Sequence, residues 1–261
     1  MSSQRPRKRQ PRQLTLDAAR KPSGRGGWRP GAGRPRGRKT VSHDARERFS
    51  AGHPQHVTLR IRPGVQSLRR GKICASVRAV LTAGGHKPAF RVVEFNVMSN
   101  HLHLLVEADG PADLARGMQG LGVRLARRIN RLLGRTGSLF ATRYHARALR
   151  TPREVRNALR YVLLNARHHA AEHGRQLARD WLDPYSSAPW FDGFHSCSRV
   201  RGQECHGPPR TCHHHRSPPP DWLAFLQRQP RPTAAPRTWL LSIGWRRHGL
   251  LLPTDVPGLA R

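Results

Sequence analysis

Two histidines one residue apart, His101 and His103, stand in the largely apolar run VMSNHLHLLVE, residues 97–107. If this run is a β-strand, alternation places both imidazoles on one face, with Leu102 and Leu104 on the other. Two imidazoles at this spacing can share one metal ion from one side of a sheet. The spacing also fits two histidines on a solvent-facing surface, or a histidine that is hydrogen-bonded within the core.

Tyr161 is the second residue whose position could support chemistry, in the segment LRYVLLNARHH. Apolar residues at helical spacing predict a helix here, and Tyr161 lies just beside its buried face. Asn165 follows four residues later and therefore shares the face of Tyr161. A tyrosine at the rim of a core face is commonly a packing residue with a solvated hydroxyl group, so the helix alone leaves its role open.

The elements that must position these side chains lie between residues 55 and 175. Alternation of apolar and polar residues predicts strands, and apolar residues three or four apart predict helices. In chain order the predicted elements are a strand over 56–62, a helix over 67–84, strands over 89–99 and 101–108, a helix over 111–134, a strand over 138–149 and a helix over 151–174. The last helix has a well-marked start, because Thr151, Pro152 and Glu154 match a capping box.

This order, β-α-β-β-α-β, is that of the ferredoxin-like split βαβ fold. We therefore predict an α+β protein in which helices cover one face of an antiparallel sheet and a further helix follows at the C-terminal end. The fold by itself implies no function.

The charge of the chain is strongly positive. Its 261 residues include 48 Lys and Arg against 15 Asp and Glu, a formal net charge of +33. A polyanion that neutralises this self-repulsion is the expected partner, which favours nucleic acid. A membrane surface is disfavoured, because no strongly amphipathic basic helix stands out beyond the core helices. There is also no apolar run of membrane-spanning length and no apolar signal segment. The protein is accordingly expected in the cytoplasm, associated with the nucleoid.

Composition divides the chain into three regions. Residues 1–54 are basic and rich in Gly, Pro and Arg, which predicts a disordered tail. Residues 55–175 form the predicted folded domain, and residues 176–261 are expected to be a poorly ordered extension with a short helix near 237–251. The three cysteines of this extension are not spaced like zinc-finger ligands, so no zinc ligand is assigned there.

Four segments taken together resemble the HUH single-tyrosine transposases, the IS200-like insertion-sequence enzymes and especially the REP-associated tyrosine transposases. The resembling segments are HVTLR (56–60), VMSNHLHLLVE (97–107), GSLFATRYHARAL (137–149) and RYVLLNARHHA (160–170). They occur in the family's order and cover the whole predicted core. The resemblance implies a transposase that cleaves and rejoins DNA.

The resemblance also implies a role for individual residues. His101 and His103 would bind a divalent metal, Mg²⁺ or Mn²⁺, with Asn165 as third ligand where related enzymes have Gln. Tyr161 would attack the scissile phosphate, giving a 5′-phosphotyrosine and a free 3′-OH, so that rejoining needs no nucleotide cofactor. One departure is Ala166, which stands where many relatives have proline.

Tyr144 is a rival nucleophile on the predicted strand 138–149. It lacks an Asn or Gln four residues later, which favours a structural or DNA-stacking role.

The implied partner is single-stranded DNA that carries imperfect palindromic hairpins. Arginines near the predicted site and on the basic helix face are candidates for contacts with its backbone. These candidates are Arg60, Arg62, Arg124, Arg128, Arg143 and Arg147.

Two other interpretations remain open. One is a domesticated relative that binds hairpin DNA without cleaving it, and the other is a basic structural or ribosome-associated protein with the same fold. The second leaves the histidine pair unexplained. The sequence leaves open whether the protein is a monomer or a homodimer, which metal it uses and which hairpin is its target. It also leaves open whether the protein moves DNA or only processes repeats.

Overall fold

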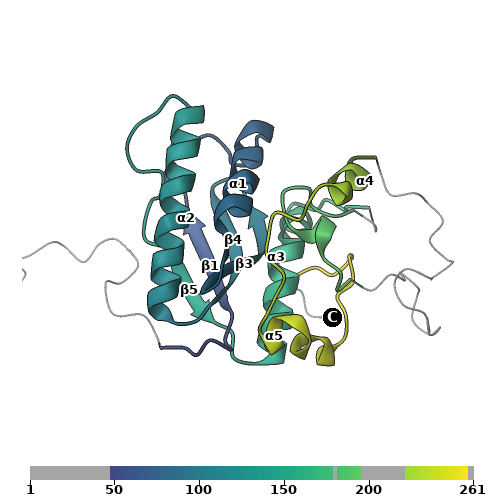
Figure 1. Ribbon diagram of the computed structural model, residues 1–261. Coiled ribbons are helices and arrows are strands. Elements are labelled where there is room, and N and C mark those ends of the chain that lie inside the picture. Colours follow the sequence, from purple (N-terminus) through teal and green to yellow (C-terminus); the bar gives the residue numbers. More distant parts are fainter. Residues whose placement is uncertain (1–47, 179–180, 195–220, 258–261) are drawn as a thin grey trace, which may run out of the picture. The chain divides into compact units, whose positions relative to one another are not determined.

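Five strands form one antiparallel sheet in the order β2-β3-β4-β1-β5 (Figure 1). The computed structural model describes residues 48–178, 181–194 and 221–257. The strands are β1 (Gln55–Arg60), β2 (His86–Lys87), β3 (Phe90–Val97), β4 (His101–Ala108) and β5 (His145–Ala148). The strands β4 and β1 lie at the centre, so the run that contains the histidine pair is paired on both sides.

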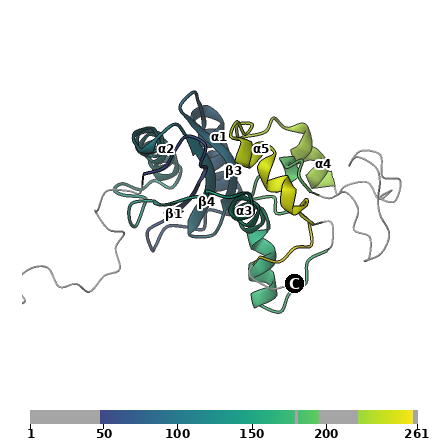
Figure 2. The same cartoon turned by 90° about the horizontal axis from the view of Figure 1, so that it is seen from below.

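Helices cover both faces of this sheet (Figure 2). The helices α1 (Gly71–Gly84) and α2 (Pro111–Leu132) pack on one face, and α3 (Pro152–Glu172) packs on the other. The shorter helices η1 (Ala188–Trp190), α4 (Asp221–Arg228), α5 (Trp239–Ser242) and η2 (Gly244–His248) come later in the chain. The predicted α+β fold with an added C-terminal helix is therefore confirmed.

The two faces of the sheet differ in chemistry. Leu102 and Leu104 of β4 are buried, together with Val57 and Leu59 of β1, in the apolar core under α1 and α2. The face toward α3 is instead largely polar at its centre, where Thr58, Asn96 and His103 are opposite one another in register. This difference comes directly from alternation along the strands.

The helices begin and end where local sequence favours it. Pro111 occupies the first turn of α2, and the apolar residues of this helix recur every three or four positions, so that one stripe is buried. At the start of α3 the Thr151 side chain accepts from the backbone N–H of Glu154, and the Glu154 side chain accepts from the backbone N–H of Thr151. The predicted capping box is thus confirmed.

The last predicted strand is shorter than expected. The alternation over 138–149 predicted one continuous strand, but only His145–Ala148 pairs regularly with β1. Before it, the chain contacts the end of β1 through an isolated bridge between Ile61 and Phe140. The short strand β2 was not predicted, and the tail predicted over 1–54 lies outside the described residues up to residue 47.

Residues after α3 pack against that helix. Leu240, Leu241 and Trp245 of α5 and η2 are buried in one cluster with apolar residues of α3. The Arg156 side chain donates hydrogen bonds to the carbonyl oxygens of Gly249 and Leu250, at 2.8 and 3.1 Å. The short helix predicted within 237–251 thus corresponds to α5 and η2, whose contacts with α3 the sequence did not indicate.

A buried ion pair anchors the start of α5 to the sheet. Glu107 of β4 is bound by Arg91 of β3, with 2.7 Å between Oε2 and Nη2. The other oxygen, Oε1, accepts from the backbone N–H and the hydroxyl group of Thr238, both at 2.8 Å. Pairing and hydrogen bonding of this kind make a buried carboxylate tolerable.

Within the described ranges, no helix combines the length and the apolar character that crossing a membrane requires.

The close contact between α2 and β3 gives a test of the packing. A Cβ atom on Gly117 would lie 2.1 Å from the ring of Phe90, whereas one on Gly120 would meet the Arg124 guanidinium at an ordinary 3.5 Å. Gly117→Ala should therefore lower the free energy of unfolding by about 1–3 kcal/mol. Gly120→Ala should raise it by up to about 1 kcal/mol through helix propensity.

Urea unfolding followed by circular dichroism measures both changes. Equal stability of the two variants would contradict the contact between Gly117 and Phe90.

Candidate active site

His101 and His103 lie side by side on β4, on the face that α3 covers. Their Nε2 atoms are 2.9 Å apart, and their rings are almost perpendicular. Because Leu102 and Leu104 are buried on the opposite face, the predicted arrangement of the two histidines is confirmed. The alternative of two independent solvent-facing histidines does not fit, because His103 is 5 % exposed.

Hydrogen bonds at the other ring nitrogens orient the pair. The side-chain oxygen of Asn100 lies 2.7 Å from Nδ1 of His101, and an amide oxygen only accepts, so Nδ1 carries the proton. The lone pair of Nε2 then faces His103. Nδ1 of His103 lies 3.2 Å from both Thr58 Oγ1 and His56 Nε2. Second partners of this kind fix the orientation of a metal-binding histidine.

The donor atoms of the pair suit a divalent cation. Two ligands at right angles around a cation with bonds of about 2.1 Å are about 3.0 Å apart, close to the Nε2 separation of 2.9 Å. Burial is the main cause that lowers the pKa of His103 to about 3, ahead of the charges of neighbouring histidines. Burial also lowers the pKa of His101. Both rings are therefore neutral near pH 7, the form that binds metal.

Tyr161 of α3 lies next to this pair. Its ring centroid is 5.1 Å from that of His103 and 5.8 Å from that of His56, with edge-to-face geometry in both contacts. Val155, Leu159, Val162 and Leu163 fix the helix by packing into the core on this side of the sheet. The side chain of Tyr161 is only partly buried, so its hydroxyl group is not enclosed by the core.

The other two tyrosines lie elsewhere. Tyr144 and Tyr185 both pack against the apolar core under α1 and α2. Arg69 also lies 4.3 Å from the ring centroid of Tyr185. Of the three tyrosines, Tyr161 is therefore the one beside the histidine pair.

Asn165 is fully buried on α3, and neither of its amide atoms has a hydrogen-bond partner. A carbonyl oxygen left unpaired in this way is a suitable ligand for a hard cation. The backbone between Tyr161 and Asn165 departs from helical geometry at Leu164. In the described part of the chain, no three His, Cys, Asp or Glu side chains form a group that could hold a metal ion. A cation bound by the histidine pair would thus need a different third donor, and the amide oxygen of Asn165 is of the right kind.

Asn96 gives a physical reason for the kink. Its side-chain Nδ2 donates to the carbonyl oxygen of Val162 at 2.7 Å, across the interface between β3 and α3. A side chain that enters the hydrogen-bond ladder of a helix is a usual cause of a kink. Asn96 is opposite His103 in the sheet register, so one polar row holds both the histidine and the helix.

Sequence reasoning missed His56, Thr58 and Asn96. Alternation along 56–62 does put His56 and Thr58 on one face of the predicted strand, so the sequence contained part of the information needed to find them. Their contacts with His103 depend on the pairing of β1 with β4, and the sequence did not give that register.

Only part of the predicted arginine set lies near the histidine pair. Arg60 is opposite His101 in the sheet, and Arg147 is opposite His56. Arg62 and Arg143 are exposed at other places around β1 and the loop before β5. Arg124 and Arg128 are on α2, which covers the other face of the sheet, and Arg124 reaches the carbonyl oxygen of Gly84 at 3.4 Å.

A family model matches the segment that contains most of these side chains. The model of a family described as IS200-like transposase matches residues 56–163, a segment that contains the histidine pair and Tyr161 and ends two residues before Asn165. No curated protein matches the chain.

Two solved structures are similar to the chain. One is a REP-associated tyrosine transposase bound to a REP hairpin, with 17 % identity, a TM-score of 0.43, and coverage of 56 % of this chain and 82 % of that one. The other is a candidate transposase from Deinococcus radiodurans R1, with 14 % identity, a TM-score of 0.33, and coverage of 53 % and 99 %. Residues 56–163 are therefore similar to the IS200-like transposases.

Proposed function

We propose that this transposase domain cleaves and rejoins single-stranded DNA next to hairpins, with Tyr161 as the nucleophile. The observation that carries the proposal is the contact between Tyr161 and His103, whose ring centroids are 5.1 Å apart. A nucleophile and a potential cation site thus meet on one polar sheet face. Effective attack requires a nucleophile held close to the phosphorus it will reach.

In the proposed reaction the Tyr161 oxygen attacks the scissile phosphorus and the phenol proton passes to solvent. The bond from phosphorus to the 3′ oxygen breaks, and that oxygen takes up a proton to become a free 3′-OH. His101 and His103 would hold Mg²⁺ or Mn²⁺, and Asn165 would supply the third donor. The bound cation would polarise a nonbridging oxygen of the phosphate. Rejoining is the reverse attack by a 3′-OH on the phosphotyrosine.

Fixation of α3 supports a site assembled within one chain. Tyr161 contacts the histidines of its own chain. The helix is also held at its start by the capping box and along its outer side by η2. A monomer acting in cis accounts for these contacts without a second subunit.

The arginines nearest the site suit a DNA backbone. Arg60 and Arg147 are both exposed, and each is opposite one of the histidines in the sheet. Their side chains can therefore contact phosphates that flank the attacked one. The net charge of +33 favours the approach of any such strand.

Replacement of the nucleophile tests the proposal. Labelled hairpin oligonucleotides with Mn²⁺ should form a covalent adduct with the full chain, visible on denaturing gels. Tyr161→Phe should abolish the adduct, because the ring and its packing remain while the attacking oxygen is lost. Tyr144→Phe is the matched control and should retain it.

An adduct that survives Tyr161→Phe would refute the nucleophile assignment. If no hairpin gives an adduct with the parent protein, the non-catalytic hairpin-binding alternative is favoured instead.

Metal binding by the pair has its own pH signature. Protons compete with a cation only near or below the pKa of the ligand, and the pKa values of His103 and His101 are lowered. Mn²⁺ affinity measured by calorimetry should therefore fall less from pH 7.5 to 5.5 than it would with two histidines of ordinary pKa. Two ordinary histidines would lose up to about 100-fold over this range.

His101→Ala should abolish this binding, whereas His86→Ala, at an exposed position on β2, should leave it intact. Equal Mn²⁺ affinity of the two variants would show that the pair is no metal site.

A further inference from the structure

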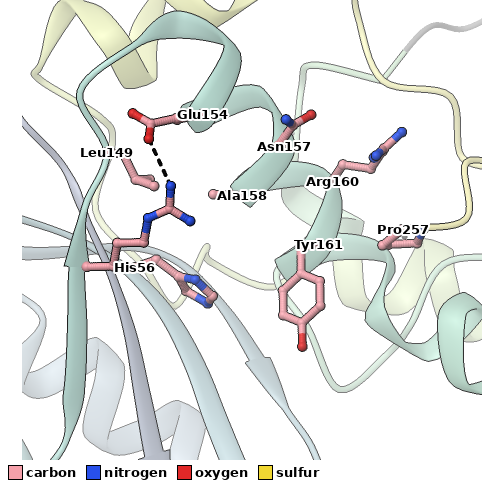
Figure 3. Close-up of a pocket in the computed structure, with 9 residues that line it drawn as sticks. His56, Leu149, Glu154, Asn157, Ala158, Arg160, Tyr161 and Pro257 are labelled. Atoms are coloured by element: carbon pink, nitrogen blue, oxygen red, sulfur yellow. Dashed lines mark hydrogen bonds and ion pairs between the residues drawn. The ribbon is translucent and has the colours of Figure 1, made fainter. Parts of the chain in front are cut away.

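A cavity of about 370 Å³ opens beside Tyr161, between β5 and the first half of α3 (Figure 3). Its volume lies at the lower end of the range for small-molecule sites, too small for a duplex. Tyr161 and His56 form the side of the cavity nearest the histidine pair. A ligand in this cavity would therefore adjoin whatever Tyr161 attacks.

Part of the cavity lining is apolar or aromatic. Leu149 and Ala158 line it and are both buried, and the rings of His56 and Tyr161 stand beside them. Apolar and aromatic surfaces of this kind bind the faces of unpaired bases without regard to base identity.

Two arginines line the same cavity, Arg147 and Arg160. Arg147 is positioned by Glu154, with 2.9 Å between Nη2 and Oε1. The other Glu154 oxygen accepts from the backbone N–H groups of Arg150 and Thr151. This carboxylate is thus largely occupied by its own helix start and by Arg147.

Arg160 differs from Arg147 in its partners. Its Nε atom is buried without a hydrogen-bond partner, and among the described residues no ion pair or hydrogen bond holds its guanidinium group. Together the two arginines make the cavity suitable for a ligand that carries negative charge.

Asn157 supplies the group that could distinguish one ligand from another. It lies one helical turn before Tyr161 on α3, lines the cavity and is exposed. Its amide presents one acceptor and one donor side by side, the combination that pairs with the edge of a base.

We propose that this cavity binds the base of one unpaired nucleotide adjacent to the scissile phosphate. Asn157 contacts the edge of that base, and Arg160 and Arg147 contact the phosphates on either side. The location next to the scissile phosphate rests on the proposed role of Tyr161. The cavity would then determine which nucleotide is accepted at one position of the cleavage site, in addition to any recognition of the hairpin.

The test uses a hairpin oligonucleotide whose cleavage position has been mapped by adduct formation with the parent chain. Each unpaired nucleotide is replaced in turn by an abasic residue, and binding to the full-length Tyr161→Phe protein is measured with Mn²⁺. An abasic residue at one position next to the cleavage point should weaken binding about tenfold, the size expected for loss of one stacked base. When Asn157→Ala is added to the protein, the difference in affinity between intact and abasic DNA should shrink at least threefold.

Arg160→Ala should weaken binding of intact and abasic DNA alike and reduce the dependence of binding on salt. Arg153→Ala, at an exposed position of the same helix outside the cavity, is the charge-matched control and should change binding less.

The proposal is overturned if Asn157→Ala leaves the abasic difference unchanged, or if Arg160→Ala and Arg153→Ala have equal effects. Failure of the parent chain to form any adduct refutes the proposed function as well. An adduct together with an unchanged abasic difference refutes the cavity assignment alone.

Discussion

The site depends on how α3 is held against a polar sheet face. An apolar helix face and a row of histidine, threonine and asparagine side chains do not attract each other by hydrophobic burial alone. Asn96 joins them, because it shares a row with His103 and donates to the carbonyl oxygen of Val162, one residue after Tyr161. Buried polar groups are tolerated when they are paired, and this bond ties the helix to the row that contains His103. Tyr161 stands beside the same row, with its ring 5.1 Å from that of His103.

The opposite face of the sheet carries a second apolar core. Leu102 and Leu104 contribute to an apolar core under α1 and α2 from the same strand that presents the histidines. Period-two alternation made this division predictable from the sequence, as it did the capping box of α3, because both depend on local patterns. The contacts of His56 and Thr58 with His103 required the β1–β4 register, a non-local property. The kink at Leu164 and the unpaired amide of Asn165 had no local signal in the sequence either.

The region after residue 176 was the least predictable. The region contains many turn-forming and aromatic residues. Its buried residues occur in short segments that are widely separated in sequence. Trp245 and Leu251 nevertheless lie in the same cluster as Leu159 and Val162 of α3. Glu107 and Arg156 hold this segment by hydrogen bonds to backbone groups at the start of α5 and after η2. Backbone partners carry no side-chain signature, which explains why these bonds could not be predicted from the sequence.

The outer cover of α3 has a consequence for the size of the folding unit. The family match ends at residue 163, inside α3, yet the surface against which η2 packs belongs to the first half of that helix. A fragment cut at the end of the match would lose the last turns of α3 and expose apolar side chains that Trp245 now covers. Exposed patches of that kind promote self-association. A fragment of this protein that keeps the cover of α3 must therefore include Trp245 and Leu251, well beyond the segment that matches the family model.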